Sequence, residues 1–269
     1  PLGWTKSSRA VLLSDGWVVG SVRVQGGPGL NLADKGRKEG IRYRRQRLDS
    51  EEKGIDLSRP LYFGTYGEWT KKAGFSVIEK GSAGPRALVW EDASFGPLLK
   101  ARQADVYLAT RETYRDFPDW RAAGAELKSW IRLTEANPQQ KDFLWSSGVK
   151  LVDYVIDPKS GKTNRLQGAL FLPAGYEPGR SYPTIVYYYE KTSPMLNRYA
   201  PPASNGFNKT VYTSNGYAVL FADIAYKVND PGMSAVWCVL PALDAAAATG
   251  VVDRTKVCLL YTSPSPRDS

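Results

Sequence analysis

Residues 181–253 constrain the fold of this chain more than any other stretch, because they contain two runs of the kind that form strands inside a sheet. Residues 183–189 and 217–224 are continuous apolar runs rich in β-branched and aromatic side chains, and Pro, Gly or Asn bounds each. Such runs are typical of parallel strands covered on both faces. An Ala-rich helical stretch over residues 234–249 follows, with Gly250 as its stop, and leads toward a further strand. This order of elements predicts an α/β sheet.

Composition indicates a folded chain without a membrane helix. At 269 residues the chain is long enough for one large domain or two smaller ones, and 42% apolar and 12% aromatic residues supply a core. No run of about 18 apolar residues occurs, so we expect no membrane span. The chain begins PLGWTKSSRA, with neither an initiator Met nor a signal peptide. We interpret this start as a cut end, which leaves cytoplasmic and periplasmic or secreted locations open.

Two residue types exclude classes of chemistry. The two cysteines, Cys238 and Cys258, are too few for a disulfide framework or a four-ligand zinc site. Histidine is absent, which removes the usual metal ligand and the usual general base. We therefore expect no metal and no cofactor.

The formal charge of +9 raises the question of an acidic partner. The densest basic patch is GRKEGIRYRRQR, residues 36–47. Its charged residues alternate with Ile41 and Tyr43, which favours the solvated face of an antiparallel strand. No nucleic-acid-binding motif accompanies the patch, so we expect no nucleic-acid partner.

The last residues, 258–269, differ from the rest in composition. The sequence CLLYTSPSPRDS changes abruptly to Ser-Pro repeats, and CLLYTSPSPRD resembles the in-frame translation of a sequencing adapter. We expect a non-native tail over 258–269, with native coding ending at Val257 and the gene truncated there. An ordinary Ser/Pro tail is the alternative. Residues 257–261 are apolar enough to imitate a strand.

The first half of the chain contains short β elements that turns separate. Regular short strands of this kind predict a sandwich, a barrel or propeller blades. Residues 17–32 and 120–134 share a pattern that ends in a short Leu-containing strand, which favours blades, with a sandwich as the alternative. Strands are expected at residues 10–13, 17–24, 41–43, 60–64, 74–79, 86–90, 105–110 and 127–133.

The sequence changes character at Asn137, where Asn-Pro-Gln-Gln is typical of a linker. A hairpin is expected next, with strands at 150–156 and 166–172 and a DPKSG turn between them. We place a domain boundary near Gln140.

Several motifs from Asn137 to Val257 follow one another in a recognisable order: NPQQKDFLW, LQGALFLP, YYYEK, SNGYAVLFADIAY, DPGMSA and TGVVD. They resemble the linker and first part of the catalytic domain of prolyl-oligopeptidase family serine peptidases, which include dipeptidyl- and acylaminoacyl-peptidases. Upstream, ADVYLATRETYRDFPD and LTEANPQ resemble the end of that family's β-propeller. The resemblance implies all-β propeller blades over residues 1–140, then α/β structure, the N-terminal part of an α/β-hydrolase domain, over 141–257.

The family implies a Ser-Asp-His triad whose serine lies on a GxSxG turn between a strand and a helix. That turn is expected directly after Val257 and is missing, and the triad Asp and His would lie further on. The nearest similar stretch, 232–236, lacks the final Gly, so we interpret Ser234 as a helix N-cap rather than a nucleophile. Without histidine no Ser-His pair forms, and the fragment is expected to be inactive.

One catalytic position of the family has a match in the chain. In the family, a tyrosine at the end of the first buried strand donates its hydroxyl to the oxyanion of the tetrahedral intermediate, and Tyr189 is the matching residue. Strand alternation places Tyr187 and Tyr189 on one face and Tyr188 on the other. Packing at the strand end is the alternative role for Tyr189.

Three charged residues near Tyr189 are further candidates. Asp223 ends the second buried strand, where the ligand crevices of α/β sheets open, or it caps the DPG loop that follows. Glu190 and Lys191 line the mouth of the site or form a surface ion pair.

The resemblance implies a fragment of a hydrolase, a serine peptidase that cleaves short peptides through an acyl-enzyme. The alternatives are an α/β-hydrolase esterase and a non-catalytic propeller that serves as an interaction module. The expected partner of the full-length enzyme is a short peptide substrate, with no nucleic acid and no membrane. The choice among dipeptidyl, prolyl and acylaminoacyl specificity stays open, as do blade number and oligomeric state.

Overall fold

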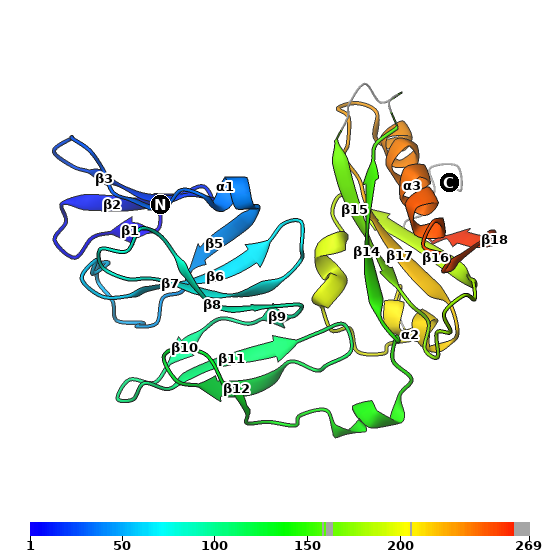
Figure 1. Cartoon of the computed structure of the whole chain (residues 1–269), viewed down its shortest axis with the longest axis horizontal. Coiled ribbons are helices and arrows are strands. Elements are labelled where there is room, and N and C mark those ends of the chain that lie inside the picture. Colours follow the sequence, from blue (N-terminus) through cyan, green and yellow to red (C-terminus); the bar gives the residue numbers. More distant parts are fainter. Residues whose placement is uncertain (158, 160–163, 205, 261–269) are drawn as a thin grey trace. The chain divides into compact units, whose positions relative to one another are not determined.

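The computed structural model describes residues 1–157, 159, 164–204 and 206–260 (Figure 1). The chain forms two compact units. The first comprises Pro1–Thr113 and Phe117–Ala136, and the second comprises Tyr114–Asp116 and the described residues from Asn137 onward. Among the helices of the described residues, none has the length and apolar character needed to cross a membrane.

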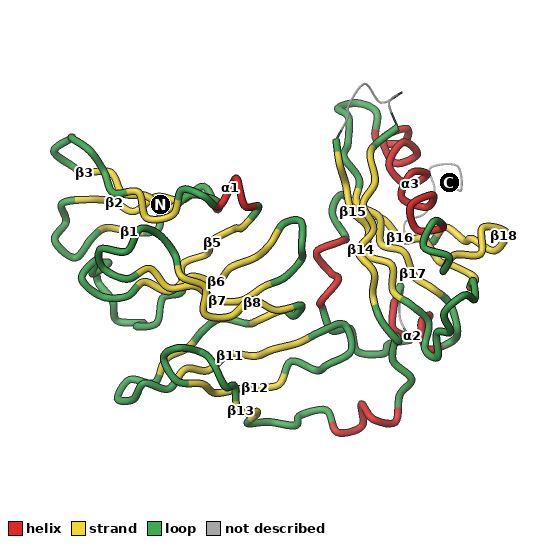
Figure 2. The backbone as a smooth tube through the Cα atoms, in the orientation of Figure 1, coloured by secondary structure: helices red, strands yellow, loops and turns green. Residues whose placement is uncertain are grey.

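Three antiparallel sheets make up the first unit, and within each the strands largely follow one another in chain order (Figure 2). The first sheet contains β1 (Gly3–Trp4), β2 (Ala10–Ser14), β3 (Val19–Arg23) and β4 (Asn31–Ala33). The short helix α1 (Gly36–Glu39) precedes the second sheet, which contains β5 (Ile41–Arg45), β6 (Leu61–Gly67), β7 (Ala73–Ile78) and β8 (Arg86–Glu91). The third contains β9 (Ser94–Phe95), β10 (Leu99–Lys100), β11 (Tyr107–Glu112), β12 (Asp119–Ala123) and β13 (Ile131–Arg132), with β9 and β10 both pairing with β11.

Alternating burial explains why these segments form sheets with one face on a core. Along β6 every second residue from Leu61 is buried, so one face of the strand points inward. Leu12, Val19 and Phe63 are completely buried in one cluster that the first two sheets share. A second cluster around Phe75 contains residues of the second and third sheets. The sheets therefore stack through shared apolar faces, and none of those in the described residues closes on itself.

Most strands expected in this half are confirmed, within a few residues of the expected bounds. The strand expected at 127–133 is wrong over its first part, since only Ile131–Arg132 is a strand. Leu127 has a φ of 51°, and its N–H donates to the carbonyl of Gly124, so the chain turns there. The turn at Leu127 interrupts the run 127–133, because the chain must reverse there for β13 to pair with β12.

The basic patch at 36–47 forms α1 and β5, which confirms the strand interpretation. Tyr43 is buried on the inner face of β5, while Arg42 lies on the exposed face and donates to Glu68 at 2.7 Å. Arg45 forms an ion pair with Glu52. Part of the positive charge is thus paired within the unit, and the absence of a nucleic-acid partner remains a prediction.

A mixed five-stranded sheet forms the centre of the second unit, in the order β14-β15-β17-β16-β18. The predicted hairpin is confirmed, since β14 and β15 pair antiparallel from Val149↔Phe171 to Val155↔Arg165. The turn between them lies partly outside the described residues. Strand β16 is parallel to both β17 and β18. The elements are η1 (Pro138–Asp142), β14 (Val149–Val155), β15 (Arg165–Phe171), β16 (Tyr182–Tyr189), η3 (Ser193–Asn197), α2 (Lys209–Ser214), β17 (Ala218–Asp223), α3 (Pro231–Ala247) and β18 (Val252–Leu259).

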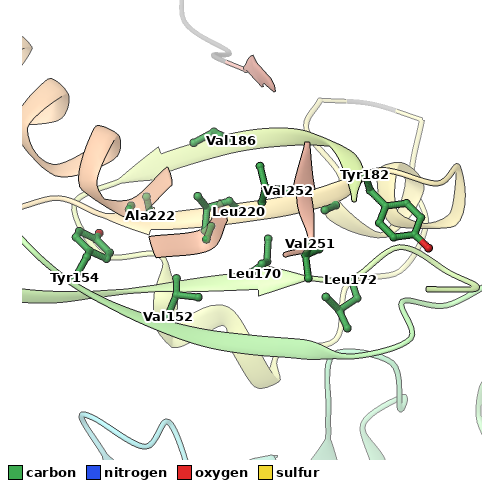
Figure 3. Close-up of a cluster of buried hydrophobic side chains, with 13 residues drawn as sticks. Val152, Tyr154, Leu170, Leu172, Tyr182, Val186, Leu220, Ala222, Val251 and Val252 are labelled. Atoms are coloured by element: carbon green, nitrogen blue, oxygen red, sulfur yellow. The ribbon is translucent and has the colours of Figure 1, made fainter. Parts of the chain in front are cut away.

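Both faces of this sheet are covered, because successive side chains of its strands point to opposite sides. Leu170 and Leu220 pack in the cluster that includes Ala242 of α3, and Figure 3 shows these two leucines with their neighbours. Phe171 and Phe221 pack on the opposite face, in the cluster that η3 and α2 border. Every residue of β17 is buried, as expected of a strand between two layers.

Helix α3 begins earlier than the sequence indicates, and the N-cap assigned to Ser234 is wrong. Asp230 is the N-cap and its side chain accepts from the N–H of Met233, while Pro231 occupies the first turn. Proline favours this place because its missing N–H would have no partner there. The helix continues through Pro241, and Gly250 follows its end with a φ of 78°. The predicted stop at Gly250 is confirmed.

Strand β18 lies at one end of the sheet order. Cys258 and Leu259 belong to it and pair with Ile185 and Val186 of β16. These two residues fall within the stretch predicted to be a non-native tail, and residues 261–269 of that stretch lie outside the described residues. The origin of the tail therefore remains a prediction.

Candidate functional site

The candidate site lies at the carboxyl ends of β16 and β17, two adjacent parallel strands of the second unit. The connection after β16 runs through η3 and α2 on one face of the sheet, and the connection after β17 runs through α3 on the other. In open α/β sheets, ligands bind where neighbouring strands send their connections to opposite sides. The fold therefore directs attention to the residues that end these two strands, Tyr189 and Asp223.

Tyr189 is the last residue of β16 and pairs in register with Asp223. Its ring centroid lies 5.8 Å from that of Tyr187, and Tyr187 stacks on Phe207 at 4.1 Å with an interplanar angle of 4°. Tyr188 packs against the cluster on the opposite face. The predicted alternation is confirmed, and it rests the ring of Tyr189 on a series of aromatic side chains.

Tyr189 is 53% exposed. Within the part of the chain that the structure describes, no side-chain hydrogen bond of Tyr189 is found, and its contacts are with the Tyr187 ring. Burial raises the pKa of Tyr187, and the nearby Tyr189 raises it further, which keeps the Tyr187 hydroxyl neutral at physiological pH.

Asp223 is buried, and both of its carboxylate oxygens accept hydrogen bonds from the turn that follows β16. Oδ1 accepts from the N–H of Thr192 and the N–H of Ser193, each at 2.7 Å. Oδ2 accepts from the hydroxyl of Ser193 at 2.6 Å. Asp223 therefore caps the β16 turn. The proposal that it caps the DPG loop is wrong, because the carboxylate at that loop belongs to Asp230.

Backbone groups complete the connection between the two strand ends. The N–H of Ile224 donates to the carbonyl of Glu190 at 3.0 Å, and the Thr192 hydroxyl donates to the carbonyl of Ala222 at 3.0 Å. From the core side, the Tyr154 hydroxyl donates to the Asp223 carbonyl at 2.5 Å. Burial raises the pKa of Tyr154 strongly, so this donor stays protonated at any pH at which the protein is folded.

Glu190 follows Tyr189 on the exposed side of the turn. Both roles suggested for Glu190 and Lys191 remain predictions. Burial raises the pKa of Tyr226, and Tyr188 and Glu190 raise it further. A carboxylate and two exposed phenols, Tyr189 and Tyr226, thus border this edge of the sheet.

The serines described near this edge, Ser193 and Ser234, are buried and hydrogen-bonded. Ser193 is completely buried and donates to Asp223, and Ser234 is buried, donates to the Asp230 carbonyl at 2.6 Å and accepts from the N–H of Lys227. The described residues hold no cluster of three metal-ligating side chains. The described residues at this edge are therefore an exposed tyrosine and a buried carboxylate that holds the neighbouring turn.

Reasoning from sequence missed Thr192 and Ser193 as partners of Asp223. A local signal exists, since Thr-Ser-Pro is typical of a helix start, and η3 does begin at Ser193 with Pro194 in its first turn. The acceptor lies 30 residues further along the chain, so only the tertiary structure identifies it.

Neither a family model nor a curated protein matches this chain. Solved structures do resemble it. The apo AtxE2 isopeptidase is 14% identical with a TM-score of 0.63, over 97% of this chain and 40% of that one. Dipeptidyl peptidase 4 from Porphyromonas gingivalis is 14% identical with a TM-score of 0.60, over 93% of this chain and 35% of that one. A putative dipeptidyl aminopeptidase IV from Bacteroides ovatus ATCC 8483 is 12% identical with a TM-score of 0.62, over 93% and 38%.

These likenesses define the fold. The chain has the fold of part of these peptidases, across antiparallel sheets and mixed sheet alike, and it spans about 40% of the length of the isopeptidase.

Proposed function

We propose that this chain is part of a serine peptidase of the prolyl-oligopeptidase family, which hydrolyses short peptides through an acyl-enzyme. The three antiparallel sheets are blades at the end of a β-propeller, and the mixed sheet begins an α/β-hydrolase domain. The observation that carries the proposal is the exposed Tyr189, which ends a parallel strand beside the buried strand β17. The fold likeness to three peptidase structures supports it.

In this proposal Tyr189 donates its O–H to the oxyanion that forms when a nucleophile attacks the scissile carbonyl. A donor fixed before the reaction stabilises the developing charge without reorganisation, and the loss of one such donor costs about 10²–10³ in kcat. The nucleophile and its base belong to parts of the enzyme outside this chain. The 269 residues alone are expected to be inactive, since no histidine is present.

A fluorophosphonate probe tests the serine mechanism. The polypeptide encoded by the complete gene should be labelled on one serine, and the 269-residue chain should not be labelled. Stoichiometric labelling of the short chain would contradict the missing nucleophile.

Substitution of Tyr189 tests the site. In the complete enzyme, Tyr189→Phe should lower kcat for a peptide chromogen by about 10²–10³-fold. The matched control is Tyr217→Phe, because Tyr217 is also an exposed tyrosine and precedes the amino end of β17. Equal, small effects of the two substitutions would exclude Tyr189 as the oxyanion donor.

The lack of a nucleophile and a base among the described side chains also favours a second candidate, a non-catalytic propeller that binds partners. A complete gene without a GxSxG turn and a later histidine would support this module. An esterase of the α/β-hydrolase class would prefer ester over peptide chromogens with the same acyl group.

A further inference from the structure

Asp223 uses its whole carboxylate on the turn that carries Tyr189, although Asp223 itself faces no ligand. We propose that Asp223 is a positioning residue that fixes Tyr189 in the geometry needed for oxyanion stabilisation. This inference rests on the proposed function and adds a residue that determines how well the donor works.

The need for such a residue follows from the end of the strand. Tyr189 and Asp223 are the last register pair between β16 and β17, and beyond this pair the Ile224 N–H bond to the Glu190 carbonyl is the remaining backbone bond between the two strand ends. Strand ends open easily when solvent competes for their hydrogen bonds. The two N–H groups of Thr192 and Ser193 converge on one carboxylate oxygen at 2.7 Å, and this fixes where the chain leaves the strand.

The bonds involved are of a strong type. Hydrogen bonds to an ionised carboxylate are roughly twice as strong as neutral ones. These hydrogen bonds are buried, since Asp223 is 5% exposed. On the core side, the Tyr154 hydroxyl donates to the Asp223 carbonyl. Asp223 is thus rigid with respect to the sheet, and the turn is rigid with respect to Asp223.

A direct chemical role for Asp223 does not fit this geometry. Asp223 is 5% exposed and its two oxygens already accept three donors from Thr192 and Ser193, so burial keeps the carboxylate away from substrate. Asp223 therefore acts through Tyr189. A displacement of about 1 Å at a reacting group costs up to about 10²-fold in rate, which sets the size of the expected effect.

The test is a double-mutant cycle in the complete enzyme, with Tyr189→Phe, Asp223→Ala and both together. Asp223→Ala should lower kcat about 10–100-fold with KM changed less than about threefold. In the Tyr189→Phe background the same substitution should lower kcat by less than about threefold, because the group that it positions is already lost. Asp223→Asn keeps the shape of the side chain and should restore most of kcat. If the alanine variant does not fold, Asp223→Ser carries the same cycle, because its short side chain also fails to reach the donors of Thr192 and Ser193.

A control at another buried carboxylate separates positioning from general destabilisation. Asp119→Ala removes another buried carboxylate that accepts three bonds, in the other unit, and should lower stability without changing kcat.

The outcomes distinguish the two proposals. Suppose that Tyr189→Phe lowers kcat, and that Asp223→Ala lowers kcat by the same factor in the wild type and in the Tyr189→Phe variant. The positioning role of Asp223 is then overturned, while Tyr189 stands as the oxyanion donor. If Tyr189→Phe leaves kcat unchanged, the donor assignment is overturned, and the inference falls with it.

Discussion

Removal of the Asp119 carboxylate should weaken the first unit by about 2–4 kcal/mol. Asp119 begins β12 and its side chain is 4% exposed. It accepts from Arg132, from the hydroxyl of Thr134 at 2.8 Å and from the N–H of Ala136 at 2.9 Å. Each bond to an ionised group is worth about 1.5–3 kcal/mol. The expected loss of stability is smaller than the sum of the three bond energies. Arg132 is 48% exposed, so in the variant water replaces Asp119 as its hydrogen-bond partner.

The assay is urea unfolding of Asp119→Ala, followed by the fluorescence of Trp130, which packs with Phe75 and Phe95. Asp105→Ala is the matched control. Its side chain is 81% exposed and pairs with Lys100 at 3.3 Å, so its loss should cost less than about 1 kcal/mol.

Acid provides a second measurement on Asp119. Burial raises the pKa of this carboxyl, but the hydrogen bonds from Ala136, Thr134 and Arg132 outweigh burial and lower it. The carboxylate therefore stabilises the fold fully above the unfolded pKa of about 3.9, and the stabilisation is lost as the pH falls through the folded pKa. The difference between wild type and Asp119→Ala should narrow below about pH 4. Two results would refute this reasoning. One is a loss of unfolding free energy at pH 7 equal to that of Asp105→Ala, and the other is a stability difference between wild type and Asp119→Ala that stays constant in acid.

Three further predictions concern packing, capping and a surface carboxylate. Leu220→Ala should lower the free energy of unfolding by about 2–5 kcal/mol, since Leu220 is completely buried in β17. Leu240→Ala on α3 should lower it by less than about 1 kcal/mol, because Leu240 is 57% exposed. Equal urea midpoints for the two variants would contradict this. Asp230→Ala removes the N-cap of α3 and should cost about 1 kcal/mol, with Asp230→Asn nearly neutral, and a large loss in the asparagine variant would exclude capping. The Asp15 carboxyl should titrate near pH 2 by NMR, because the N–H of Val18 and the N–H of Trp17 lower its pKa to about 2; an ordinary value would show that these bonds are absent in solution.

Much of the second unit follows from local sequence. The continuous apolar character of residues 183–189 and 217–224 predicts buried strands, and both form within a residue of the expected bounds. Gly250 ends the helical stretch because a left-handed backbone conformation favours glycine. The alternation that places Tyr187 beside Tyr189 is a property of any strand. These features depend on neighbours in the chain, so the sequence alone determines them.

Only the tertiary structure decided which distant residues meet. It placed β16 between β17 and β18, moved the cap of α3 to Asp230, and brought Asp223 to Ser193 across 30 residues. The local sequence around a carboxylate at a strand end does not specify which turn will donate hydrogen bonds to it. The donors are selected when the strands pair and the core is buried. A buried carboxylate must be hydrogen-bonded, and the only donors within reach are those at the end of the neighbouring strand.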